Sequence, residues 1–264
     1  MRAQAKRTPW LWPLLLIAMG VVLLLDNLLL IDLDVASLWP VVFIALGLQL
    51  LVRGDIAPSW QAHTFGITRG SVQTGSVEIE SGEVDVQLRA LRKSGRLIAG
   101  QYTARSRPNL TVRNNHARVR MQRGQTWWLS MADWDVGLAE DLPWEILASS
   151  YLGELEFDLR GLLVRRVALA SGLASVTLTC PETATGPLYA RSTLGNVRVT
   201  VPEGSRARIT VKGGPFGRVR VNPARFGRIQ AGVFATTPPD DNPLDDVVDL
   251  DITVSTVFGS IVVN

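Results

Sequence analysis

A six-residue pattern that recurs about every 21 residues constrains the fold more than any other feature of the chain. Each copy has a bulky apolar residue, a small residue, any residue, and then an apolar–any–apolar triplet. The small residues stand at positions 153, 174, 195, 217 and 259, so the last interval spans two periods. A fixed period near 20 with short alternating strands is typical of a β-solenoid, because one coil cannot bury its apolar face alone. The copies are Leu152–Phe157, Leu173–Leu178, Leu194–Val199, Phe216–Val221 and Phe258–Val263.

The pattern predicts an all-β domain over residues 71–264, with regular repeats in 143–264 and a less periodic front part in 71–130. The inward Leu, Val, Ile and Phe positions of stacked coils are expected to share one core, with glycine at a tight turn or bulge. A β-sandwich with regularly spaced turns is the alternative fold. The tryptophans expected to cap the end of the stack are Trp127, Trp128, Trp134 and Trp144.

Two uncharged apolar runs predict an N-terminal transmembrane helical hairpin over residues 10–53. The runs extend from Pro9 to Leu25 and from Val35 to Val52, and each carries Trp-Pro followed by Ile-Ala-x-Gly. A helix of this length spans about 26 Å, close to a hydrocarbon core of about 30 Å. A cleavable signal peptide is disfavoured, because no small-x-small site follows the first run and a second run comes almost at once. A buried core hairpin is the other alternative. The rings expected at the membrane interface are those of Trp10, Trp12 and Trp39.

Charges beside the two runs predict their orientation. Basic residues flank the pair of runs, whereas only acids lie between them. Positive residues remain on the cytoplasmic side, so both termini and the β domain are expected inside, with residues 1–9 as a basic tail and 54–70 as a linker. No ionisable residue falls within either run, which favours an anchor or sensor over a transporter. The flanking residues are Arg2, Lys6, Arg7 and Arg53, and the acids between the runs are Asp26, Asp32 and Asp34.

These features resemble those of a known bacterial family. The paired Trp-Pro spans are similar to the membrane region of LiaF-like and LiaI-like proteins, and the segments Pro143–Ile146, Gly153–Leu159 and Ala170–Leu178 resemble the family's C-terminal domain. That domain is all-β and solenoid-like, and is called a toast-rack. Cys180, where the pattern favours Leu, and Ala174, at the usual Gly, depart from it. The resemblance implies a non-enzymatic membrane regulator of the envelope-stress response that binds a membrane partner such as a sensor histidine kinase.

No residue pattern indicates catalysis, a cofactor or a metal. His63 and His116 lie far apart in the sequence and lack neighbours of the kind that bind metals. Cys180 falls at an inward position and is expected to behave as a small buried hydrophobe. Gly213 and Gly214 precede a strand and not a helix with Lys-Ser or Lys-Thr, so they do not form a phosphate loop. The sequence therefore indicates a protein that is not an enzyme.

Clusters of charged residues indicate a candidate binding surface. A net charge of +3 is too small to indicate nucleic acid. Arg198 and Arg220 hold equivalent outward positions and would align as a ladder on stacked coils, facing either solvent or an anionic leaflet. An acidic excursion over 240–251 is either a site for a basic partner or an insertion. The predicted membrane- or partner-facing residues are Arg198, Arg206, Arg208, Arg218, Arg220 and Arg228.

Two other functions fit the same sequence. A membrane-tethered scaffold would assemble through its solenoid and self-associate. An exported carbohydrate-binding or adhesin-like module would require the β domain to lie outside the cell. The partner of a regulator would be a lipid bilayer and a signalling protein, without nucleic acid.

Overall fold

A computed structural model describes residues 62–91, 95–103, 106–123, 133–236 and 248–264. The chain divides into two units, Met1–Arg53 and Gly54–Asn264, and every described residue lies in the second. The predicted transmembrane hairpin and its tryptophans at 10, 12 and 39 lie outside the described residues. Within the described ranges, no helix has the length and apolar character needed to cross a membrane.

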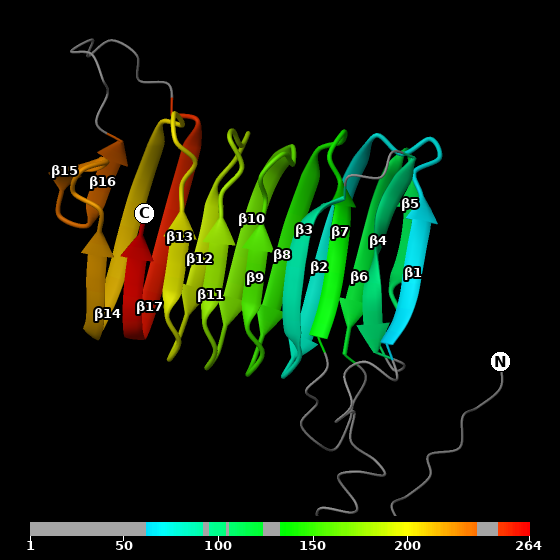
Figure 1. The fold of residues 1–264 in the computed structure, drawn as a ribbon, viewed down its shortest axis with the longest axis horizontal. Helices are drawn as coiled ribbons and strands as arrows, with labels where there is room; N and C mark the ends of the chain where they lie inside the picture. The colour runs from blue at the N-terminus through cyan, green and yellow to red at the C-terminus, as the bar shows by residue number, and fades with distance from the viewer. Residues whose placement is uncertain (1–61, 92–94, 104–105, 124–132, 237–247) are drawn as a thin grey trace, which may run out of the picture. The chain divides into compact units, whose positions relative to one another are not determined.

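The described part of the chain is built from β-strands (Figure 1). Most strands alternate buried and exposed residues, as expected for strands with one face in a core. The strands are β1 (Ala62–Thr68), β2 (Thr74–Gly82), β3 (Asp85–Leu91), β4 (Arg96–Thr103), β5 (Asn109–Arg113), β6 (His116–Gln122), β7 (Asp133–Ala139), β8 (Trp144–Ser150), β9 (Leu155–Asp158), β10 (Val164–Ser171), β11 (Val176–Thr179), β12 (Leu188–Ser192), β13 (Val197–Thr200), β14 (Ala207–Val221), β15 (Phe226–Gln230), β16 (Val233–Thr236) and β17 (Leu250–Val263).

Parallel pairing arranges these strands in two facing layers. Layer A runs in the order β6, β2, β8, β10, β12, and then the first halves of β17 and β14. Layer B runs in the order β7, β3, β9, β11, β13, and then the second halves of β17 and β14. Each coil gives one strand to each layer. The stack has the β-solenoid-like architecture predicted from the repeat, which is also the toast-rack-like fold that the resemblance implies, and not that of an antiparallel sandwich.

The order of coils in the stack differs from their order in the sequence at both ends. The β2–β3 coil lies between the β6–β7 coil and the β8–β9 coil. The last coil, β17, is inserted between β12–β13 and β14 (Figure 1). Gly259 is therefore in register with Gly217, which precedes it by 42 residues. The double interval in the repeat marks this insertion.

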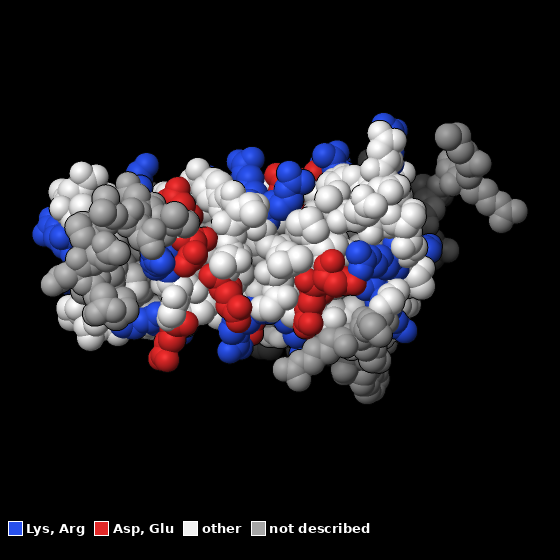
Figure 2. Space-filling model, turned by 90° about the horizontal axis from the view of Figure 1, so that it is seen from above, with Lys and Arg blue, Asp and Glu red and all other residues white. Residues whose placement is uncertain are grey.

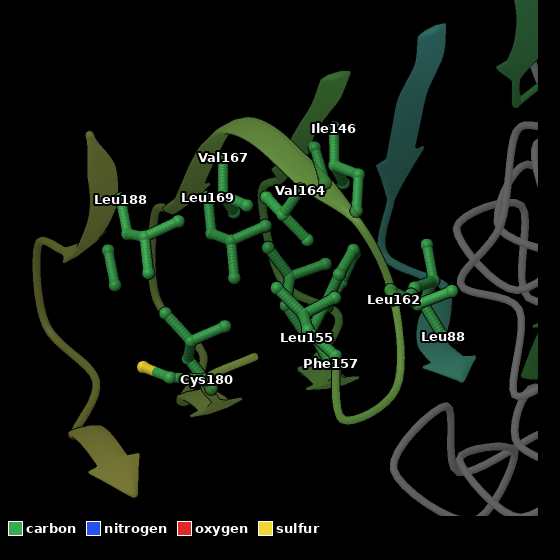
Figure 3. Packing of buried hydrophobic residues seen from close by; sticks show 14 of the residues in the cluster. Leu88, Ile146, Leu155, Phe157, Leu162, Val164, Val167, Leu169, Cys180 and Leu188 are labelled. Carbon is green, nitrogen blue, oxygen red and sulfur yellow. The ribbon is translucent and has the colours of Figure 1, made fainter. Parts of the chain in front are cut away.

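The core lies between the two layers (Figure 3). In the repeats ending at 157, 178, 199 and 263, the fourth and sixth residues of the unit are buried. The first, bulky apolar residue is exposed in every copy, so the expectation that all apolar positions share the core is wrong for this one. Cys180 is buried as predicted, and burial raises the pKa of its thiol to about 12.

Two tryptophans lie in the core, contrary to the prediction that they cap the stack. Trp134 of β7 and Trp144 of β8 are both fully buried, and the Trp144 indole donates a hydrogen bond to the Ala139 carbonyl at 2.7 Å. The Trp144 ring occupies the space where Gly75 lacks a side chain. The Trp144 ring can be buried because its polar N–H has this partner. The tryptophans at 127 and 128 lie outside the described residues.

Antiparallel strands flank the stack at both ends. β1 pairs with β4, β4 with β7, and β5 with β6 at one end. The β15–β16 hairpin pairs with the first half of β14 at the other. β1 is formed by residues that the sequence assigned to the linker 54–70.

A polar ladder fixes the turn that joins the two layers. A Ser or Thr stands three residues before the small residue in four coils, and it is buried in each. Ser192 Oγ accepts from the Gly195 N–H at 2.8 Å and donates to the Ala174 carbonyl of the next coil at 2.9 Å. These hydroxyls satisfy backbone groups at a turn buried between coils. The members of this ladder are Ser150, Ser171, Ser192 and Thr256.

Candidate interaction surfaces

The residues considered for metal or catalytic chemistry lie apart. His63 stands on β1 and its ring contacts that of Tyr102, with 5.6 Å between ring centroids. His116 lies on β6, where its two ring nitrogens are 2.8 Å from Thr74 Oγ1 and 3.1 Å from Ser76 Oγ. Across the described ranges, no three His, Cys, Asp or Glu side chains are grouped as metal ligands would be.

The six predicted basic residues fall in three places. Arg198, Arg218 and Arg220 are exposed on the outer face of layer B. Arg206 and Arg208 lie where β14 begins, in layer A. Arg228 lies on the terminal β15–β16 hairpin. The stack thus brings three of the six together and places the others elsewhere.

Insertion of β17 separates the two arginines that were expected to form a ladder. Arg198 is in register with Val262, and Val262 is in register with Arg220. The two guanidinium-bearing strands are therefore two strand spacings apart, about 10 Å. Layer A repeats the arrangement, because Arg191 and Lys212 flank Ser255 of β17.

Acids occupy the other end of layer B. Asp133 of β7 is in register with Asp85 of β3, and Asp135 lies two residues further along β7. Partial burial, and then the charge of Asp85, raise the pKa of the Asp133 carboxyl. Asp135 instead accepts a hydrogen bond from Arg89 at 2.6 Å. Layer B therefore changes from acidic to basic along the stack.

The raised pKa of Asp133 predicts a specific pH dependence of stability. The Asp133 carboxyl binds its proton more tightly in the folded state than in the unfolded state. The ionised carboxylate therefore destabilises the fold at neutral pH, and this destabilisation is relieved as pH falls through the raised pKa. We expect Asp133→Asn to raise the free energy of unfolding at pH 7 by a few tenths of a kcal/mol, because solvent screens so exposed a site.

Urea titrations between pH 3 and 7 measure this effect. Asp135→Asn is the matched control on the same strand, and it should lower stability at neutral pH because it weakens the pairing with Arg89. Equal shifts of the unfolding midpoint in the two variants would contradict the assignment.

Exposed apolar side chains gather along one edge of the stack, where layer A strands turn into layer B strands. We name this row the apolar edge; within the described residues it holds seven of the twelve exposed large hydrophobic side chains. Leu173 N donates to the Tyr151 carbonyl and Leu194 N to the Gly172 carbonyl, so successive turns stack in register. The rings of Phe216 and Phe258 stack with centroids 5.2 Å apart. The members are Tyr151, Leu152, Leu173, Leu194, Phe216, Val257 and Phe258.

The opposite edge is polar and rich in acids. Figure 2 looks onto it and shows acidic side chains spread along its length, with basic ones beside them. The Asp158 carboxylate accepts hydrogen bonds from the Arg160 guanidinium, which lower the pKa of this carboxyl. The acids in the turns of this edge are Glu140, Asp141, Asp158, Glu182, Glu203 and Asp249. Of the predicted acidic excursion, Asp249 lies at this edge, and residues 240–247 lie outside the described part.

Comparison with known families identifies the segment that precedes this β domain in the sequence. Residues 10–51 match the LiaI-LiaF-like transmembrane region. The resemblance read from the Trp-Pro spans is therefore confirmed for that segment, and the match indicates association with a membrane. A comparison with curated proteins gave no match.

Solved structures share the β architecture. A candidate cell adhesion protein from Clostridium sporogenes ATCC 15579 aligns with a TM-score of 0.66 and 14% identity, over 77% of this chain and 98% of that one. A candidate adhesin from Bacteroides fragilis NCTC 9343 aligns with a TM-score of 0.30 and 8% identity, over 78% of this chain and 99% of that one. At such a low identity the similarity to the Clostridium sporogenes protein establishes the fold alone. The similarity to the Bacteroides fragilis protein, with its lower TM-score, carries no further argument.

Proposed function

We propose that the protein is a membrane-anchored, non-enzymatic regulator of envelope-stress signalling, which holds a membrane partner such as a sensor histidine kinase. The observation that carries the proposal is the LiaI-LiaF-like transmembrane match at residues 10–51, ahead of a toast-rack-like β domain. Two spans with both termini in the cytoplasm would place the domain beside the cytoplasmic parts of such a partner.

The outer face of layer B is the surface we assign to the partner. Its strands are short, in register and backed by a continuous core, so the charges on them are held at fixed spacing. Arg198 and Arg220 project from strands on either side of β17 and would meet an acidic segment of the partner. Complementary charge of this kind sets orientation and the rate of encounter more than affinity.

Crosslinking in native membranes tests this proposal. The full chain is crosslinked and recovered before and after treatment with a wall-targeting antibiotic, and the attached proteins are identified. We expect a sensor kinase in the untreated sample and a changed recovery after treatment. Arg198→Glu with Arg220→Glu should lower the recovery several-fold, because charge reversal repels an acidic partner.

A matched control lies on the other layer. Arg191→Glu with Lys212→Glu makes the same change of charge around the same inserted strand, and should leave recovery unchanged. If neither condition yields a kinase or another membrane protein, the regulatory proposal fails. If both double variants lose the partner equally, the assignment to layer B is wrong.

A structural scaffold is the second candidate, and an open strand edge favours it. Within the described residues, Phe216–Val221 of β14 pairs with β17 on one side only. Exposed backbone groups of such an edge can pair with another chain. Filaments that lengthen with protein concentration would favour this candidate over the regulator.

An exported adhesin-like module is the third candidate, suggested by the name of the Clostridium sporogenes neighbour. Protease added outside intact cells would cleave the β domain of an exported module. The same domain would be protected in the orientation that we propose.

A further inference from the structure

We propose that the apolar edge lies against the phospholipid bilayer, so that the β domain rests on the membrane with this edge and turns its acidic edge away. The inference uses the membrane association of residues 10–51 but does not depend on the signalling role. Three independent features of the domain support it.

The first feature is the continuity of the row. The in-register residues Leu152, Leu173, Leu194, Phe258 and Phe216 come from five neighbouring coils. Each is between 39% and 71% exposed, although the fourth and sixth residues of the unit are buried in four of the five copies. At one strand spacing per coil the row is about 19 Å long. Single exposed hydrophobic residues are ordinary, but an unbroken row of them marks an interaction site.

The second feature is the difference in charge between the two edges. The apolar-edge turns 172–175, 193–196, 214–217 and 257–259 contain no charged residue, and the turn 151–154 at the end of the row carries one acid, Glu154. The turns at the opposite edge carry acids in successive coils. An anionic leaflet would repel that acidic edge and accept the apolar one. The polarity of the domain is therefore that of a body lying on a membrane surface.

The third feature is the edge at which the chain enters the domain. Ala62, the first residue of β1, is in register with Thr103 at the end of β4, and β4 runs antiparallel to β7. The strands of layer B begin at the apolar edge, so β1 begins there as well (Figure 1). Only residues 52 to 61 separate Ala62 from the matched transmembrane region. Ten residues reach at most about 35 Å, which keeps this edge close to the bilayer.

Basic side chains stand next to the row on layer B. Arg218 follows Phe216 by two residues, and Arg198 follows Leu194 by four. If the apolar side chains enter the boundary between headgroups and acyl chains, a depth of about 5–10 Å, these guanidinium groups lie at the level of the phosphates. The basic residues predicted from the sequence would then serve both lipid and partner.

Fluorescence quenching in vesicles tests the proposal with the full chain. The protein is reconstituted in phosphatidylcholine–phosphatidylglycerol vesicles after attaching an environment-sensitive dye at a single introduced cysteine. The native Cys180 is fully buried, so the dye reacts at the new site. Leu194→Cys and Phe258→Cys place the dye on the apolar edge. Leu163→Cys places it at the opposite edge, on a side chain that is 51% exposed and therefore a matched control.

We expect brominated lipids to remove most of the dye fluorescence at positions 194 and 258, and aqueous iodide to remove most of it at 163. Adding Leu152→Asp and Leu173→Asp should abolish the lipid quenching at 258, because charged side chains do not enter the acyl boundary. Unchanged circular dichroism would establish that these surface changes leave the fold intact.

Several outcomes would overturn the proposal. Lipid quenching at 163 equal to that at 194 would do so, and so would quenching of all three sites by iodide alone. Protection from both quenchers that fades as the protein is diluted in the membrane would mean that a second copy covers the edge. Lipid quenching in a protein that captures no kinase would refute the signalling role and leave this inference standing.

Discussion

Removal of the last seven residues, Phe258–Asn264, is expected to destroy the cooperative fold of at least the C-terminal half of the β domain. Phe258–Val263 of this segment is the second half of β17, which lies between β13 and β14. Ile261 and Val263 are fully buried, and burying two such side chains contributes about 3–6 kcal/mol. Whole domains are stable by only about 5–15 kcal/mol, so this loss alone approaches the total.

Loss of hydrogen bonds adds to the loss of burial. Without this segment, the backbone groups of β13 and β14 that face β17 have no strand between them. The two coils on either side can close the gap only by shifting a whole strand spacing, about 4.8 Å. Half a coil removed from inside the stack therefore opens the core, whereas half a coil removed from its end would shorten it.

Urea unfolding followed by the fluorescence of the buried tryptophans measures the effect of the truncation. We expect either no cooperative transition or a midpoint far below that of the full chain. Val262→Ser is the control, because this residue lies on the outer face of the same strand and its pairing is unchanged. An unchanged midpoint for the truncated chain would contradict the insertion of β17.

The insertion also limits the order of folding. β17 follows the other described strands in the sequence, so the strands on either side of it precede it. Pairing between distant segments pays the entropy of closing a long loop before it gains contacts. We therefore expect the coils β8–β13 to form first and β14 to dock together with β17.

Local pattern was sufficient to predict the coils, and the reason is periodicity. Alternation in Val176–Thr179 or Val197–Thr200 identifies a strand with one buried face, and the 21-residue spacing identifies the coil. The order of the coils could not be predicted in this way. The units that begin at Phe216 and Phe258 are almost equivalent, so their local sequence does not state which one contacts Leu194–Val199.

The direction of the first apolar residue in each unit also escaped prediction. Leu194 precedes Gly195 at the turn between layers, and the turn interrupts the alternation that holds within each strand. The exposed row therefore appeared in the sequence as part of the core pattern. The separation of Arg198 from Arg220 by β17 could not be predicted for a related reason, since it depends on which coil neighbours which.

Gly195→Ala is expected to lower the free energy of unfolding by about 1–3 kcal/mol, the usual cost of forcing a methyl group into a filled site. The backbone at Gly195 is not in the left-handed region, so a restriction of φ does not explain the choice of residue. The cause is close approach: a Cβ added there would overlap the Ala174 carbonyl of the neighbouring coil. Because Ser192 Oγ also binds that carbonyl, the two coils cannot separate without losing the hydrogen bond.

Ala174→Gly is the matched control for this prediction. Ala174 holds the equivalent position one coil away, where a methyl group is already accommodated. Its replacement by glycine should cost no more than about 1 kcal/mol, from the added freedom of the unfolded chain. Urea titration of both variants compares the two effects directly. If Gly195→Ala proved no more destabilising than Ala174→Gly, the turn would have room for a side chain. The small residue of the repeat would then need an explanation other than the distance between coils.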